Sequence, residues 1–136
     1  MLFRSSSTTR TSVRVLVVDD HALFADALTM FLQRDERIEV VGVASSGQEA
    51  IDLAQARLAD VVLMDIFMRG MDGLEATKRL RAIRPETHVI VLTGLSGDEI
   101  GGEARAAGAD GHLRKGDVHD RIVEAVLRVA HGKPLA

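Results

Sequence analysis

Short apolar runs recur along the chain and predict five β-strands. The runs are Val13–Val18, Ile38–Ala44, Asp60–Met64, Thr87–Leu92 and a weaker Ala109–Leu113. The first and fourth are almost unbroken aliphatic stretches, which is typical of strands that are buried on both faces. Strands of this kind occur where helices cover both sides of a parallel sheet.

The segments between these runs have the spacing of amphipathic helices. Their apolar positions recur every three or four residues, as in Phe24, Ala27, Leu28, Phe31 and Leu32, in Ala50, Leu53, Ala54 and Leu58, and in Ile122, Val123, Val126, Leu127 and Ala130. Ser46 and Asp72 are suitable N-caps, and Glu75 stands three residues after Asp72. We therefore expect helices to follow the strands in regular alternation.

Alternation of strands and helices with short connections predicts an α/β fold. It favours a flavodoxin-like (βα)5 arrangement, a doubly wound parallel sheet with strand order 2-1-3-4-5 and right-handed crossovers. The 136 residues suffice for one such domain, which we assign to residues 13–131. Residues 1–12 are interpreted as a disordered leader and residues 132–136 as the start of a linker or a C-terminal tail.

Composition excludes several classes of function. The chain has no cysteine, so disulfides, thiol catalysis and Cys-ligated zinc are ruled out. Its net charge is −3, and Arg4 and Arg10 lie in the leader, so residues 13–136 carry −5. This balance disfavours sequence-independent binding of nucleic acid, which needs a basic surface. No apolar run approaches the roughly 20 residues of a membrane span, and we expect a cytoplasmic protein.

Polar residues stand at the ends of four predicted strands. Asp19 and Asp20 follow the first strand, Asp65 the third, Thr93 the fourth, and the fifth leads to Lys115. Ligands of open α/β sheets bind at the carboxyl ends of the strands, where the strand order switches. Taken alone, an acid pair most often forms a turn or caps a helix, a threonine usually has a structural role, and a lysine is usually a surface charge. Because these residues follow different strands of one sheet, their combination favours a single functional site.

Converging carboxylates repel one another unless a cation lies between them. Mg²⁺ suits this position because it prefers oxygen ligands and is commonly shared between carboxylates, waters and a phosphate. Asp65 could then attack phosphorus and form an aspartyl phosphate, with Lys115 neutralising charge and Thr93 bonding the phosphoryl oxygens. We interpret His21, next to the acids, as the start of the first helix rather than as a metal ligand.

Four segments carry a family resemblance. VLVVDDHALFADAL, DVVLMDIFMRGMDGLEA, HVIVLTG and AAGADGHLRKGD resemble the motifs of bacterial two-component response-regulator receiver domains, over about residues 13 to 131. The DDH sequence and the VVG after the first helix are most similar to the NarL/FixJ subfamily. The resemblance implies Asp65 as phosphoacceptor. It implies Mg²⁺ bound by Asp20, Asp65 and the Phe67 backbone carbonyl, with Asp19 acting through water.

The resemblance also implies roles for the remaining site residues and for partners. Lys115 would hold the phosphoryl group, and Thr93 would be the switch hydroxyl, with His112 at the position of the second switch residue. The phosphate would come from a sensor histidine kinase. Such a domain is not an enzyme in the usual sense, since it catalyses only its own phosphorylation and dephosphorylation. Most subfamily members control transcription through a C-terminal helix-turn-helix domain that this chain lacks, and homodimers are compatible with the pattern.

The sequence departs from the family pattern at two positions near the site. His112 replaces the usual Tyr or Phe, so its charge would make the switch sensitive to pH in the range of about 6–7. A tolerated exposed histidine is the alternative interpretation. Arg69 replaces the usual proline and is followed by Gly70, which frees the backbone of this loop. Arg69 could also reach the phosphoryl group or the partner.

Two further departures concern stability and kinetics. Gly101 and Gly102 predict a marginal or broken fourth helix, or one that starts near Gly102, because each glycine costs about 0.8–1 kcal/mol against alanine. Phe67 and Leu95 are apolar where the family tunes attack by water, so we expect slow dephosphorylation. Lys115 precedes Gly116 instead of proline, and no cis bond is expected there.

Two other functions stay open. A haloacid-dehalogenase-like phosphatase also uses a strand-end Asp, Mg²⁺, a Thr and a Lys, but it needs a second Asp where this chain has Phe67. A receiver-like interaction domain that works without phosphate is the other alternative. The intact acids argue against it, whereas His112 and the paired glycines favour it.

Overall fold

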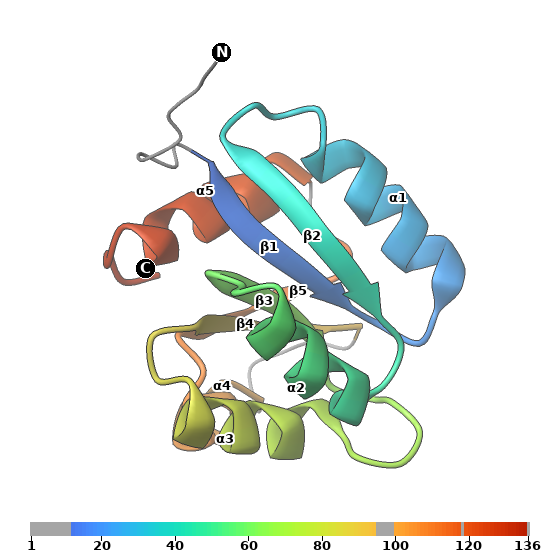
Figure 1. The fold of residues 1–136 in the computed structure, drawn as a ribbon, viewed down its shortest axis with the longest axis vertical. Coiled ribbons are helices and arrows are strands. Elements are labelled where there is room, and N and C mark those ends of the chain that lie inside the picture. The colour runs from blue at the N-terminus through green and yellow to red at the C-terminus, as the bar shows by residue number, and fades with distance from the viewer. Residues whose placement is uncertain (1–11, 95–99, 118, 136) are drawn as a thin grey trace.

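The computed structural model describes residues 12–94, 100–117 and 119–135, and strands and helices alternate along them (Figure 1). The strands are β1 (Val13–Val18), β2 (Ile38–Ala44), β3 (Val61–Asp65), β4 (His88–Thr93) and β5 (Gly111–Arg114). The helices are α1 (Ala22–Leu32), α2 (Gly47–Ala56), α3 (Gly73–Ile83), α4 (Ile100–Ala106) and α5 (His119–Ala130). The predicted α/β alternation is confirmed.

The five strands form one parallel sheet in the order β2-β1-β3-β4-β5, as predicted. β1 and β3 are therefore neighbours, with Val18 opposite Met64. Because both strands stop at the same level, the residues that follow Val18 lie beside Asp65, the last residue of β3. This register brings two of the predicted acidic positions together.

Helices cover both faces of the sheet and create two separate cores. α1 and α5 pack on one face and α2, α3 and α4 on the other, as Figure 1 shows. All five residues of β3 are buried, which explains why its first four, Val61 to Met64, are apolar, and Asp65 is the buried polar residue at its end. No helix in the described part of the chain is long and apolar enough to cross a membrane.

The predicted helix patterns need two corrections. In α1 the buried residues are Ala25, Leu28 and Leu32, whereas Ala27 is exposed, because only a narrow stripe of this helix faces the sheet and α5. In the second helix, Leu58 does not belong to the buried stripe. α2 ends at Ala56, and Leu58 is an exposed residue with a φ of 52° in the turn that follows.

Both predicted N-caps are confirmed. The Ser46 side chain accepts a hydrogen bond from the backbone N–H of Glu49 at 3.1 Å, and that of Asp72 accepts one from Glu75 at 2.8 Å. The Asp72 cap starts α3 directly at Gly73. A Cβ on Gly73 would overlap the backbone carbonyl of Asp65, with the Asp65 carbonyl carbon only 2.8 Å away. This close approach requires a glycine.

The fourth helix is short but continuous through both of its glycines. Within the described residues α4 runs from Ile100 to Ala106, so the helix is not broken at the glycine pair, and the alternative of a short helix that starts near Gly102 agrees with this range. The predicted role of Leu95 lies outside the described residues. No cis peptide bond occurs in the described segments, in agreement with the expectation for Lys115 and Gly116.

Candidate functional site

The predicted site residues lie along the carboxyl edge of the sheet. Asp19 and Asp20 follow β1, Asp65 ends β3, Thr93 ends β4 and Lys115 follows β5. The backbone N–H of Lys115 donates to the Thr93 carbonyl at 2.8 Å, which extends the pairing of β4 and β5 by one step. Parallel topology alone therefore places these polar groups at one edge.

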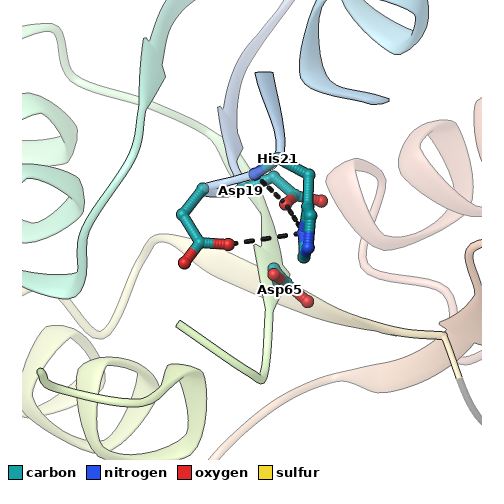
Figure 2. Close-up of side chains that lie close together, drawn as sticks. Asp19, His21 and Asp65 are labelled. Carbon is teal, nitrogen blue, oxygen red and sulfur yellow. Dashed lines mark hydrogen bonds and ion pairs between the residues drawn. The ribbon is translucent and has the colours of Figure 1, made fainter. Parts of the chain in front are cut away.

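Three carboxylates and one imidazole converge there. Asp19, Asp20, His21 and Asp65 each offer one ligand atom, and these four atoms lie within 4.8 Å of one another. Figure 2 shows the side chains of Asp19, His21 and Asp65 turned toward a common point. The predicted convergence of the acids is confirmed, and His21 is an addition that the sequence did not assign to the cluster.

Lys115 compensates part of the negative charge. Its ammonium Nζ lies 2.5 Å from Asp19 Oδ2 and 3.3 Å from Asp65 Oδ1. The ring of Phe24 lies beneath this ammonium, with its centroid 4.8 Å away, in the geometry of a cation–π contact. Phe24 was predicted only as an apolar residue of the first helix, and nothing in its spacing revealed this contact.

The two buried carboxyls have pKa values shifted in opposite directions. Burial and the charge of Asp19 together raise the pKa of Asp65 to about 6, although Lys115 partly offsets them. Burial also acts to raise the pKa of Asp19, but hydrogen bonds and charge from Lys115 and His21 outweigh it and hold the pKa below its usual range. The pKa shifts therefore favour the ionised form of Asp19 and disfavour the ionised form of Asp65.

One carboxylate oxygen of Asp65 has no hydrogen-bond donor among the described residues. The residue is 1% exposed, and its Oδ2 accepts no hydrogen bond from any residue that the structure describes. A buried polar atom without a partner costs about 1–3 kcal/mol, and more when it is charged. A hard divalent cation fits this donor set, because it takes oxygen ligands and relieves the repulsion between the carboxylates.

The loop after β3 contributes Phe67, Arg69 and Gly70. The Phe67 side chain is 56% exposed, and the backbone N–H of Arg69 lies 3.4 Å from Asp20 Oδ2. Gly70 has a φ of 77°, a conformation that glycine adopts without strain. A proline at position 69 would lack the N–H that lies near Asp20, and Gly70 supplies the positive φ that follows it.

The two predicted switch residues lie on β4 and β5. Thr93 is buried and follows Leu92, which is the register partner of Asp65. His112 is half-buried opposite Val91, and its imidazole lies on α4, where a Cβ on Gly101 would come within 2.9 Å of its Cε1. The two positions are therefore one and two strands away from Asp65.

The fold and the clustered acids define the class, and the family comparison agrees with it. Residues 15–127 match the model of the response regulator receiver domain, and the chain belongs to this family. It is the receiver domain of a two-component response regulator. Its relatives and structural neighbours place it among the NarL/FixJ type.

Individual proteins show the extent of the similarity. Response regulator GacA of Pseudomonas aeruginosa is 39% identical over 121 residues, which are 89% of this chain and 56% of that protein. Transcriptional regulatory protein LiaR of Bacillus subtilis is 38% identical over 122 residues, which are 90% and 58% of the two chains. The chain thus spans little more than half the length of these relatives.

Solved structures agree with the fold. The signal receiver domain of a protein described as response regulator NarL from Mycobacterium tuberculosis has a TM-score of 0.86 and 36% identity. The match covers 91% of this chain and 100% of that one. The response regulator domain of CheB from Thermotoga maritima has a TM-score of 0.82 and 30% identity, over 90% of this chain and 99% of that one.

Proposed function

We propose that this domain accepts a phosphoryl group on Asp65 from a phosphohistidine of a sensor kinase and then controls an output. The observation that supports it best is Asp65 Oδ2, a buried carboxylate oxygen without a partner among the described residues, beside two further acids and a lysine. An oxygen already engaged in hydrogen bonds would have to break them before it could form a bond to phosphorus. This one is free to react.

In the transfer, Asp65 acts as the nucleophile. Its Oδ2 forms a bond to phosphorus while the bond between phosphorus and the donor imidazole nitrogen breaks, and that nitrogen keeps the electron pair. Lys115 stays on the other carboxylate oxygen, 3.3 Å away, and attracts the incoming phosphoryl oxygens. Asp19 holds Lys115 in this place from the other side.

Asp20, Asp65 and the Phe67 backbone carbonyl would hold Mg²⁺ directly, and Asp19 would act through a water molecule. When bound, the ion neutralises the charge that builds up between the acids and the phosphoryl group. Asp20 suits direct contact because it is less buried than Asp19 and is not paired with Lys115. The exposed Phe67 carries no group that could position water, which supports slow dephosphorylation.

Thr93 and His112 are the proposed response elements. The Thr93 hydroxyl would bond the phosphoryl group, and His112 would change its contact with α4. Phosphorylation then shifts a population between two conformations and is not a turnover reaction. The names of GacA and LiaR indicate response regulation and transcription, so we propose a DNA-binding output domain, in the part of such proteins that this chain does not span.

The test is phosphorylation of the chain by a small phosphoramidate, which presents the P–N bond of phosphohistidine, with and without Mg²⁺. We expect one phosphoryl group per chain by intact mass spectrometry, none in Asp65→Asn, and full labelling of Asp52→Asn, a matched exposed aspartate on α2. Equal labelling of Asp65→Asn would contradict the proposal. Steady phosphate release from phosphoesters would instead indicate the phosphatase. Beryllofluoride shifts that stay at Asp65 and do not reach Thr93 and His112 would indicate the phosphate-independent domain.

A further inference from the structure

His21 lies against the acids in a way that its helix does not require. Its imidazole Nδ1 is 3.1 Å from Asp19 Oδ1 and 3.3 Å from Asp20 Oδ1. Its backbone N–H also donates to Asp19 Oδ1 at 2.8 Å, which fixes the residue next to that carboxylate. In Figure 2 the ring of His21 lies beside the carboxyl groups of Asp19 and Asp65.

The position of His21 at the N-cap of α1 does not explain this orientation. Cap side chains normally accept a hydrogen bond from the first turn of the helix, and the His21 side chain accepts none. The side chain is also 69% exposed, so packing does not force the ring inward. The contacts that orient the imidazole are those with Asp19 and Asp20.

We propose that His21 is a nitrogen ligand of the metal site and that it makes the site prefer transition ions such as Co²⁺ and Ni²⁺ over Mg²⁺. The inference rests on the proposed function of the same site. A second observation points to an ion independently of His21, because the unpartnered Oδ2 belongs to Asp65, which is 1% exposed. The ion would lie among all four groups.

Coordination needs only a change of tautomer at His21. In the structure Nδ1 contacts two carboxylate oxygens, so a neutral ring carries its proton on that nitrogen and shares it with the acids. Binding of an ion moves this proton through solvent to Nε2, and the Nδ1 lone pair then points to the metal. The net charge of the ring does not change, and no other reactant is consumed.

The selectivity follows from the chemistry of the two kinds of ion. Mg²⁺ is hard, binds oxygen and retains water, so an imidazole adds little to its affinity. Co²⁺ and Ni²⁺ accept imidazole nitrogen well and bind mixed nitrogen and oxygen sites more tightly than earlier ions do. One nitrogen added to the oxygen ligands therefore strengthens the binding of the transition ions and leaves that of Mg²⁺ nearly constant.

The experiment measures the affinities of the chain for MgCl2, CoCl2 and NiCl2 separately by titration calorimetry. We expect His21→Asn to weaken Ni²⁺ and Co²⁺ binding about tenfold or more, and to change Mg²⁺ binding by less than about twofold. The visible spectrum of bound Co²⁺ should also change as a nitrogen ligand is lost. Asn is a favourable N-cap, so the variant keeps the start of α1, and His21→Ala confirms the result without a side-chain oxygen.

His88→Asn is the matched control. His88 also contacts a carboxylate, Asp110, at 3.1 Å, but at the opposite end of the sheet, so its removal should leave all three affinities unchanged. Equal loss of Mg²⁺ and Ni²⁺ affinity in His21→Asn, or unchanged Ni²⁺ affinity, would overturn the inference. Mg²⁺ binding that Asp65→Asn does not weaken would instead overturn the proposed function, whatever the His21 variants show.

Discussion

The acidic site and the region where His112 lies on Gly101 differ in how much of the fold supports them. The site is built at the ends of β1 and β3, which each pair with a strand on both sides. His112 and Gly101 belong to β5, an edge strand of four residues, and to α4, a helix of seven. We call this second region the α4–β5 edge.

This difference indicates that the acidic site is rigid and that the α4–β5 edge can change conformation. Reacting groups must hold fixed positions, and buried central strands provide them. A response that shifts a population needs an element whose two states differ by only a few kcal/mol. A short helix with two glycines beside an edge strand meets that need. Substitutions that displace the backbone should therefore be costly beside the site and mild at the α4–β5 edge.

The largest effect is expected from Gly73→Ala beside the site. The new Cβ would overlap the Asp65 backbone, which has a strand on each side and cannot move away. We expect a loss of about 3 kcal/mol in the free energy of unfolding, measured by urea denaturation. A variant as stable as the parent chain would show that the end of β3 is not rigid and would remove the basis of the comparison.

Asp65→Asn should stabilise the metal-free domain at neutral pH. The pKa of Asp65 is raised from 3.8 to about 6, so the folded state binds this proton more tightly than the unfolded state. Stability is therefore lost as pH rises between these two values, and the deficit persists above the upper one. Asparagine has no such deficit, so we expect it to raise the free energy of unfolding by about 2–3 kcal/mol at about pH 8 and by only about 0.5 kcal/mol at about pH 4.

The measurement is urea denaturation of both proteins in a chelator at the two pH values. The lowered pKa of Asp19 acts in the opposite sense, as its stabilisation is lost on acidification, but Asp19 is present in both proteins. Mg²⁺ should reduce the difference in unfolding free energy between the two proteins at high pH, because it stabilises only the parent chain, which carries the Asp65 carboxylate. An equal difference in unfolding free energy at both pH values would mean that the pKa of Asp65 is not raised by folding.

The sequence predicted the site positions well because topology determines them. In a parallel sheet every strand delivers its last residue to the same edge, so Asp65 and Thr93 could be placed without any coordinates. The strand starts were less accurate. Asp60 and Thr87 were predicted as strand residues, but Asp60 accepts a bond from the Arg14 backbone and Thr87 donates to the Ala59 carbonyl. β3 and β4 begin one residue later, at Val61 and His88, so both residues precede their strands.

Side-chain directions could not be predicted from the sequence. The contacts of His21 with both acids and of Phe24 with Lys115 depend on which way α1 turns over the sheet. The same rotation explains why Ala25, and not the predicted Ala27, belongs to the buried stripe of α1. Periodicity gives the existence of such a helix, whereas its rotation is decided by the packing of the sheet and α5 against it.

Gly102→Ala should raise stability at the α4–β5 edge. A Cβ at this position meets no atom within 4 Å, and the residue lies in a helix with an ordinary φ. The substitution reduces the freedom of the unfolded chain, so we expect a gain of about 0.5 kcal/mol in urea denaturation. A loss of stability would show that this part of α4 is packed as tightly as the site.

Gly101→Ala should give the smallest effect, because a gain and a clash oppose each other. The same entropic gain is expected as at Gly102, but the new methyl group lies 2.9 Å from His112 Cε1 and displaces the ring. In the His112→Ala background the clash is absent, so Gly101→Ala should stabilise by about 0.5 kcal/mol more than in the parent chain. Additive effects in this double-mutant cycle would mean that the imidazole does not pack on α4. If His112 also responds to phosphorylation, Gly101→Ala should alter the NMR shifts that beryllofluoride induces at residue 112, whereas Gly102→Ala should not.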